Sequence, residues 1–400
     1  MRLVKRLQRA QLSVQALSRL ASVCIFLLAS WTDPRHLPLV ALQGALLAIP
    51  YTLIEALVGR PLSAGLVPES WPVERWARRA AAVVSLPVAA VAFASASIAL
   101  PETGIADRLL MITPVLLQLP LEATFWAAAR TWPRPKANLV PQLTAAGTLL
   151  GGTVFALVDV RLDAAAIPAQ VGVLAWVLLR RPDRGIAPGP LAGVRLGYTY
   201  CVAAAVDLLY VVALPSIAGH IVGPAAIVVL RAMELAFGPF HVALSASQRE
   251  DVVEGRRSKV LTGTRIFTVV LLVVVSIAVT GSAWIRHLLA ADLAAVSRVA
   301  VAAYCGYKAA VMFSTWLSTR HMIWAPPRRY LVSAIGSRVL AFAGLAVSAL
   351  WLRQLTGLFT QLMVAEAAVV AWYAVRMLRT PSDPTPAREP ADQSSAGDRG

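Results

Sequence analysis

Charged side chains inside long apolar runs are the residues of this sequence best placed to do chemistry. If those runs cross a bilayer, a charge at the centre costs about 2.5 to 3.5 kcal/mol on insertion scales. Such residues therefore face a water-filled cavity or pair with one another. Of the charged residues inside or near the ends of these runs, six are the candidate site residues: Arg19, Asp207, Arg231, Glu234, Lys308 and Glu366.

The second half of the chain holds five of these six residues. Arg231 and Glu234 are three positions apart, so they share one face of a helix. Two interpretations stay open for this pair, namely mutual neutralisation and a role for Arg231 in binding a substrate. Asp207 and Lys308 lie near the middle of their apolar runs, where neither side chain reaches an interface easily. We expect both to line a cavity.

Arg19 and Glu366 have other surroundings. Arg19 lies near the start of its apolar run, from which its stem can extend to the membrane surface. Glu366 lies near the middle of the last run and is a candidate partner for a basic residue.

The composition predicts that the elements carrying these residues are membrane helices. The 400 residues are 58% hydrophobic and 14% charged, whereas soluble domains carry roughly 25% charged residues. A span needs roughly 17 to 25 apolar residues, and twelve segments qualify. We expect spans at residues 14–31, 37–58, 80–100, 109–129, 139–158, 164–179, 196–214, 222–246, 266–285, 299–318, 331–352 and 358–375.

The distribution of basic residues gives the orientation of these spans. About 27 of the 37 Lys and Arg residues fall at the two ends of the chain and in alternate loops. The positive-inside rule then places both termini in the cytoplasm, in agreement with an even number of spans. The predicted fold class is an all-α polytopic bundle of about twelve transmembrane helices in two six-helix lobes.

A loop rich in Gly and Pro divides the chain. We expect an N-terminal lobe at residues 1–180, a cytoplasmic linker at 181–195 and a C-terminal lobe at 196–378. Residues 379–400 are nearly devoid of apolar side chains and predict a disordered cytoplasmic tail.

The sequence argues against several classes of function. It has no GxxxxGK[ST] motif for nucleotide binding, and its Cys and His residues lack the spacing of metal ligands. We therefore expect no cofactor and no metal. The net charge of +16 follows the loops between apolar runs, so we expect no nucleic-acid partner. The outer loops are too short for a catalytic domain, and we expect a protein that is not an enzyme.

Two stretches resemble the polysaccharide and lipid-linked oligosaccharide flippases of the multidrug/oligosaccharidyl-lipid/polysaccharide exporter superfamily, which include the O-antigen flippases. The stronger is VDLLYVVALPSIAGHIVGPAAIVVLRAMELAFGPFHVALSASQRE at residues 206–250. It looks like the seventh and eighth helices of that family. The weaker is Gly59-Arg60-Pro61 after the second span.

The resemblance implies a flippase that moves a lipid-linked pyrophosphate glycan from the inner to the outer leaflet by alternating access. On that basis Arg19, Arg231 and Lys308 contact phosphate or acidic sugar, while Asp207, Glu234 and Glu366 balance or switch charge. The implied partners are the lipid-linked glycan, membrane lipid and the glycan polymerase or glycosyltransferase machinery. The implied location is the bacterial inner membrane.

Two alternatives stay open beside a flippase. One is an ion-coupled secondary exporter of a small molecule, and the other is an integral membrane glycosyltransferase or polymerase. The charge of the central cavity distinguishes a flippase from an exporter. A cationic cavity suits an anionic lipid headgroup, whereas a neutral cavity suits drugs.

Overall fold

The first half of the chain folds into long helices joined by short turns. The computed structural model describes residues 2–63, 65–180, 185–238, 240, 244, 259–281, 296–351 and 354–378. In the first half the elements are α1 (Arg2–Thr32), α2 (Leu37–Leu46), α3 (Ala48–Ile54), the π-helical η1 (Glu55–Gly59), α4 (Arg60–Ser63), α5 (Val73–Ala99), α6 (Ile105–Thr131), α7 (Arg134–Ala137), α8 (Leu139–Leu157), the 3-10 turn η2 (Leu162–Ala164) and α9 (Ile167–Leu178).

The second half of the chain is also helical. Its elements are α10 (Ala192–Leu196), α11 (Tyr198–Val222), α12 (Pro224–Ala236), α14 (Lys259–Gly281), α17 (Arg298–Trp324), α18 (Pro327–Trp351) and α19 (Leu355–Leu378). The described residues form helices and no strand, which confirms the all-α fold class. The predicted tail at 379–400 and most of the loop at 245–258 lie outside the described residues.

Each of the twelve predicted spans overlaps a helix, but some boundaries differ. Within the described residues, seven helical segments are long and apolar enough to cross a membrane, and α1, α9 and α14 contain shorter apolar stretches. The helix at the N-terminus begins at Arg2, well before the predicted start of the first span. Residues 2–13 contain neither Gly nor Pro, so nothing in them interrupts the helix.

Sharp turns separate neighbouring helices where glycine or proline requires them. Gly223 has a φ of 110° between α11 and α12, a conformation that side chains with a Cβ rarely adopt. Pro224 follows at the first position of α12, where its missing N–H carries no penalty. This turn returns the chain antiparallel, and it places Arg231 on α12 beside the first-half helices.

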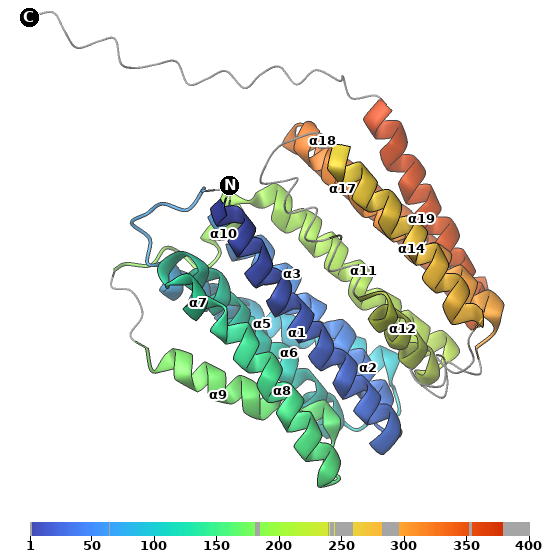
Figure 1. The fold of residues 1–400 in the computed structure, drawn as a ribbon, viewed down its shortest axis with the longest axis horizontal. Helices are drawn as coiled ribbons and strands as arrows, with labels where there is room; N and C mark the ends of the chain where they lie inside the picture. Colours follow the sequence, from blue (N-terminus) through green and yellow to red (C-terminus); the bar gives the residue numbers. More distant parts are fainter. Residues whose placement is uncertain are drawn as a thin grey trace, which may run out of the picture.

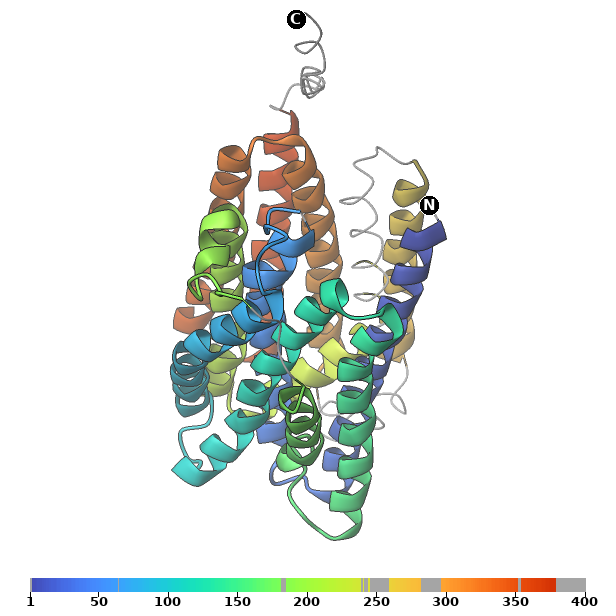
Figure 2. The same ribbon diagram turned by 90° about the vertical axis from the view of Figure 1, so that its left-hand side faces the viewer.

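The helices run side by side along one direction (Figure 1). Helices α1 to α9 form one group, and α14, α17, α18 and α19 form another (Figure 1). Figure 2 shows the bundle from the side of the first group. Helices α11 and α12 lie between the groups: α11 packs on α5, α3 and α18, and α12 packs on α2. The start of α1 and the end of α19 lie at the same end of the bundle (Figure 1). The predicted lobe boundaries at residues 180 and 196 stay a prediction.

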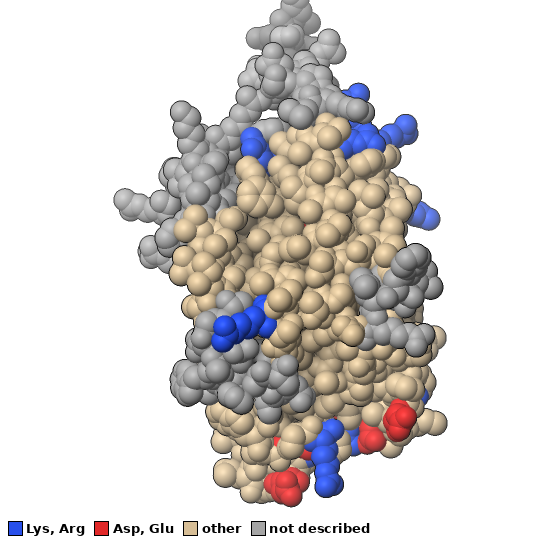
Figure 3. Space-filling model, turned by 90° about the vertical axis from the view of Figure 1, so that its right-hand side faces the viewer, with Lys and Arg blue, Asp and Glu red and all other residues tan. Residues whose placement is uncertain are grey.

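Charged residues gather at the two ends of the bundle. On the face in Figure 3, Lys and Arg occupy the end near the termini, and acidic and basic residues share the opposite end. The band between them is mostly uncharged, as a surface in contact with lipid tails requires. Exposed apolar side chains such as Leu86, Leu150 and Val339 are therefore lipid-facing rather than misplaced.

Close contacts fix α5 against α11. The Ser95 and Ser216 hydroxyls are 2.7 Å apart and buried. Ser216 also donates to the Val212 carbonyl at 2.7 Å, which leaves its oxygen to accept from Ser95. One turn farther along, a Cβ on Gly219 would lie 2.6 Å from the Ala99 carbonyl. The two backbones are therefore nearly in contact at the end of the bundle away from the termini.

A buried polar network holds the segment between α8 and α9. Asp163 in η2 is fully buried and accepts from Arg161 at 2.6 Å, and Arg161 also pairs with Asp107 at the start of α6. The hydrogen bond to Asp163 raises the pKa of the Arg161 guanidinium. Gln43 on α2 donates to the carbonyls of Met111 and Asp163 at 2.9 and 2.7 Å. Helices α2, α6 and the η2 turn are thereby joined at one point.

Candidate functional site

Arg231 and Glu234 form the intrahelical pair that their spacing predicts. Arg231 Nη1 lies 3.3 Å from Glu234 Oε2, one turn apart on α12. Arg231 is 7% exposed, whereas the Glu234 side chain is 34% exposed. The guanidinium is thus enclosed by protein, and its carboxylate partner stays accessible to a molecule between the helices.

Lys308 on α17 approaches the same carboxylate. Its Nζ lies 3.8 Å from Glu234 Oε1, and Lys308 is 7% exposed. The rings of Tyr304 and Tyr307 lie 5.4 and 5.5 Å from the ammonium, within cation–π range. Two buried cations therefore share one carboxylate.

Arg19 on α1 adds a third positive charge. It is exposed, and its Cδ lies 3.9 Å from the position of a Cβ on Gly238, just past α12. Its guanidinium acts electrostatically on Arg231, Glu234 and Lys308. We call Arg19, Arg231, Glu234 and Lys308 the charge cluster. It contains three cations and one carboxylate, so a formal excess of two positive charges lies where α1, α12 and α17 meet.

Gly44 brings α2 directly onto the cluster. A Cβ at Gly44 would lie 2.6 Å from Arg231 Nε and 2.8 Å from Cζ. The absence of a side chain at this position allows the guanidinium to lie flat against α2. Arg231 thus connects a helix of the second half with one of the first.

Asp207 and Arg338 form a separate ion pair that sequence reasoning missed. Arg338 Nε on α18 donates to Asp207 Oδ1 on α11 at 2.5 Å. The Arg338 guanidinium also lies 5.5 Å from the Tyr210 ring, one turn after Asp207. The apolar run around Arg338 was the signal that could have identified it, since the same criterion singled out Asp207.

Glu366 on α19 occupies the most enclosed position of the six predicted residues. It is 1% exposed, and its Oε1 accepts a hydrogen bond from Ser314 on α17. Its Oε2 has no hydrogen-bond partner among the described residues. Arg338 and Lys308 both act electrostatically on this carboxylate. A basic partner for Glu366 stays a prediction.

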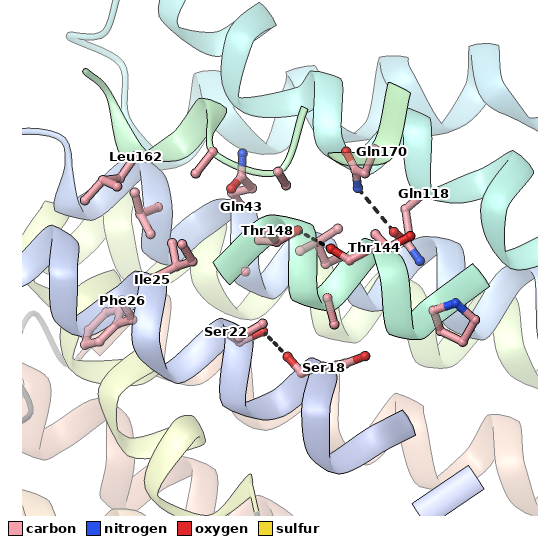
Figure 4. Close-up of a pocket in the computed structure, with 18 of the residues that line it drawn as sticks. Ser18, Ser22, Ile25, Phe26, Gln43, Gln118, Thr144, Thr148, Leu162 and Gln170 are labelled. Atoms are coloured by element: carbon pink, nitrogen blue, oxygen red, sulfur yellow. Dashed lines mark hydrogen bonds between the residues drawn. The ribbon is translucent and has the colours of Figure 1, made fainter. Parts of the chain in front are cut away.

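A cavity in the first-half helices opens beside Arg231. Its lining comes from α1, α2, α3, α6, α8, α9 and the η2 turn, with Arg231 contributed by α12. Figure 4 shows Gln118 and Gln170 facing one another, and the hydroxyls of Ser22 and Thr148 turned toward carbonyls of their own helices. Its volume is about 90 Å³, well below the roughly 300 to 1,000 Å³ of most ligand pockets.

Solved structures of other proteins share this arrangement of helices. The sequence matches no family profile and no curated protein. An inward-facing multidrug resistance MATE family transporter of the MOP superfamily aligns over 93% of this chain and 98% of its own, with 12% identity and a TM-score of 0.60. Lipid II flippase MurJ, in an inward closed conformation, aligns over 94% of this chain and 88% of its own, with 9% identity and a TM-score of 0.65.

A third structure differs in the polarity of its pocket. It is a MOP superfamily transporter from Pyrococcus furiosus whose reverse polarity of the binding pocket suggests a different function. It aligns over 94% of this chain and 95% of its own, with 14% identity and a TM-score of 0.52. At these identities the likeness concerns the fold alone. The chain has the helical fold of MOP-superfamily transporters, shared with both MATE transporters and a lipid flippase.

Proposed function

We propose that the chain flips a lipid-linked glycan, carried on a phosphate or pyrophosphate, across the inner membrane of a bacterium by alternating access. The observation that supports this most is the excess of positive charge in the charge cluster. A phosphate group crossing a low-dielectric slab needs fixed countercharge along its path. Arg231 offers a planar guanidinium for two parallel hydrogen bonds to phosphate oxygens, and Lys308 adds a point charge.

Glu234 has a specific part in this proposal. Its two carboxylate oxygens pair one with Arg231 and the other with Lys308. An incoming phosphate competes for the same donors, so Glu234 is released as the anion binds. One anion thereby exchanges for another, so Arg231 and Lys308 keep an anionic partner in both states. We propose that Asp207 and Arg338 hold α11 to α18 during this exchange.

The position of the cluster suits a transport cycle. Arg231 contacts Gly44 on α2, and Glu234 contacts Lys308 on α17. A phosphate that draws these groups together therefore changes how the first-half helices sit against α17. The proposed orientation places both termini in the cytoplasm, in agreement with the location of the α1 start and the α19 end at one end of the bundle (Figure 1).

A small-molecule exporter is the second candidate, because multidrug transporters have the same fold. Such a protein requires a cavity suited to neutral or cationic drugs, and a cluster with excess positive charge opposes cations. The glycan polymerase or glycosyltransferase machinery remains the partner that we propose for the flippase.

Deletion of the gene in its native host tests the proposal. We expect loss of surface glycan, with the lipid-linked unit retained on the cytoplasmic leaflet. Wild type should complement, and Arg231→Ala should fail at equal membrane abundance. Arg376→Ala is a matched control, since Arg376 stacks on Trp372 at 4.5 Å near the end of α19. Unchanged surface glycan, together with altered resistance to drugs, would favour the exporter.

A further inference from the structure

The cavity beside Arg231 has an unusual lining for a site next to a charge cluster. Apart from Arg231, its polar residues are uncharged: Ser18, Ser22, Gln43, Tyr51, Gln118, Thr144, Thr148 and Gln170. A charged ligand group would gain no countercharge from them. We therefore expect the cavity to bind uncharged groups that form hydrogen bonds.

Gln170 has a hydrogen-bond acceptor without a partner. Its Nε2 donates to the Pro114 carbonyl at 3.0 Å and to Gln118 Oε1 at 3.2 Å. A carbonyl only accepts, so the contact with Pro114 fixes the orientation of the amide. Gln170 Oε1 is left with no partner among the described residues, although Gln170 is only 2% exposed. An unpaired buried acceptor of this kind costs about 1 to 3 kcal/mol, so a donor that reached this buried oxygen would be favoured.

The hydroxyl groups of the lining are also acceptors. Ser22 donates to the Ser18 carbonyl at 3.1 Å, Thr144 to Val140 at 2.8 Å and Thr148 to Thr144 at 2.7 Å. Each hydroxyl hydrogen is thereby used within its own helix, and the oxygen lone pairs remain. The cavity consequently presents these acceptor oxygens beside the donor groups of Tyr51 and Gln118, a mixture that suits the hydroxyl and acetamido groups of sugars.

The size and position of the cavity define which part of a substrate enters. A volume of about 90 Å³ admits at most part of one sugar ring. Arg231 belongs both to this lining and to the charge cluster. A phosphate held by Arg231 would therefore carry part of its first sugar directly into the cavity, and the remaining glycan would stay outside.

We propose that this cavity recognises the sugar attached to the phosphate, and that this sugar is uncharged and bears free hydroxyl or acetamido donors. The inference rests on the proposed function and narrows its substrate class. An acidic sugar is disfavoured, because its carboxylate would face the acceptor oxygens of Gln170, Thr144 and Thr148.

Binding to the purified protein in lipid nanodiscs tests this inference. The probes are inorganic phosphate, N-acetylglucosamine 1-phosphate and glucuronic acid 1-phosphate. We expect the neutral sugar phosphate to bind more tightly than the other two. Gln170→Leu should reduce its advantage over inorganic phosphate roughly tenfold, the effect of one lost buried hydrogen bond.

A second variant keeps the inference testable if Gln170→Leu fails to fold. Thr148→Val keeps the side-chain shape and removes the hydroxyl, so it should also reduce the advantage of the sugar phosphate. Gln142→Leu is the matched control, because Gln142 is on α8 but outside the cavity lining. It should leave all three affinities unchanged.

The outcomes separate this inference from the proposed function. Two results would overturn the sugar site while phosphate binding still depends on Arg231. In one, the sugar phosphate binds no more tightly than inorganic phosphate. In the other, it binds more tightly, but Gln170→Leu and Thr148→Val do not change the difference. Preference for the glucuronic acid probe would do the same. If no probe binds, or if Arg231→Ala changes no affinity, the phosphate site fails and the sugar site fails with it.

Discussion

Gly44, in the first half of the chain, contacts Arg231 in the second half. A Cβ added to Gly44 would lie only 2.6 Å from Nε of the Arg231 guanidinium. A side chain on α2 is therefore incompatible with the observed position of a residue on α12. The position of the Arg231 guanidinium therefore depends on how α2 packs against α12.

Gly44→Ala should reduce transport roughly tenfold, which corresponds to about 1.4 kcal/mol. The added methyl displaces the guanidinium, and because Arg231 is buried, the displacement also weakens its contact with Glu234. Uptake or flipping in proteoliposomes measures the effect. Gly172→Ala is the control, since a Cβ at Gly172 meets nothing within 4 Å. Equal transport by both variants would contradict a role for the contact.

Glu234→Gln should lower the abundance of folded protein, because Arg231 and Lys308 then face one another without a carboxylate. Because the Glu234 side chain is 34% exposed, we expect a loss below the roughly 3 to 5 kcal/mol that breaking a fully buried ion pair costs. The double variant Glu234→Gln, Lys308→Met should recover abundance but not transport. Thermal unfolding in detergent measures the first effect. If the double variant is no more stable than Glu234→Gln, Lys308 is not the destabilised partner.

Asp207 and Arg338 should behave as a coupled pair in a double-mutant cycle of Asp207→Asn and Arg338→Gln. They lie on different helices at 2.5 Å, so we expect a coupling free energy of roughly 0.5 to 3 kcal/mol. The same cycle between Asp207→Asn and Arg376→Gln, which lies on α19, gives the baseline for comparison. Additive effects of Asp207→Asn and Arg338→Gln would show that the ion pair does not hold α11 to α18.

Alkaline phosphatase fused after residue 378 should be inactive, because the enzyme folds only outside the cytoplasm. A fusion after residue 222, at the turn between α11 and α12, should be active. The reverse pattern would invert the proposed orientation. We expect an odd number of spans between the two fusion points, so activity of both fusions would show that this number is even and that our division into spans is wrong.

The sequence contained most of the fold but only the local part of the site. Apolar length predicts a span whatever its neighbours are, so all twelve segments overlap helices. The Arg231–Glu234 pair was predictable because residues three apart share a helix face. The contact between Lys308 and Glu234 depends on how α17 packs against α12, which spacing along the chain does not specify.

The residues of the cavity and the partner of Arg338 could not be predicted from charged residues in apolar runs. Gln118 and Gln170 are uncharged, so a search for charges inside apolar runs passes over them, yet they line the cavity. Arg338 met the criterion, but its partner is 131 residues away. Buried amides in apolar runs are the additional pattern that would have indicated the cavity.

The π-helical segment at Glu55–Gly59 has a consequence for insertions and deletions. A π-helical turn amounts to one extra residue wound into an α-helix. Loss of one residue there would restore regular winding and leave the flanking helices in register. Loss of one residue elsewhere in the same span would rotate all that follows by about 100° and turn the Arg60 face away from its neighbours. Length variation in this helix is thus tolerable at one place, next to the Trp126 ring that packs on Gly59.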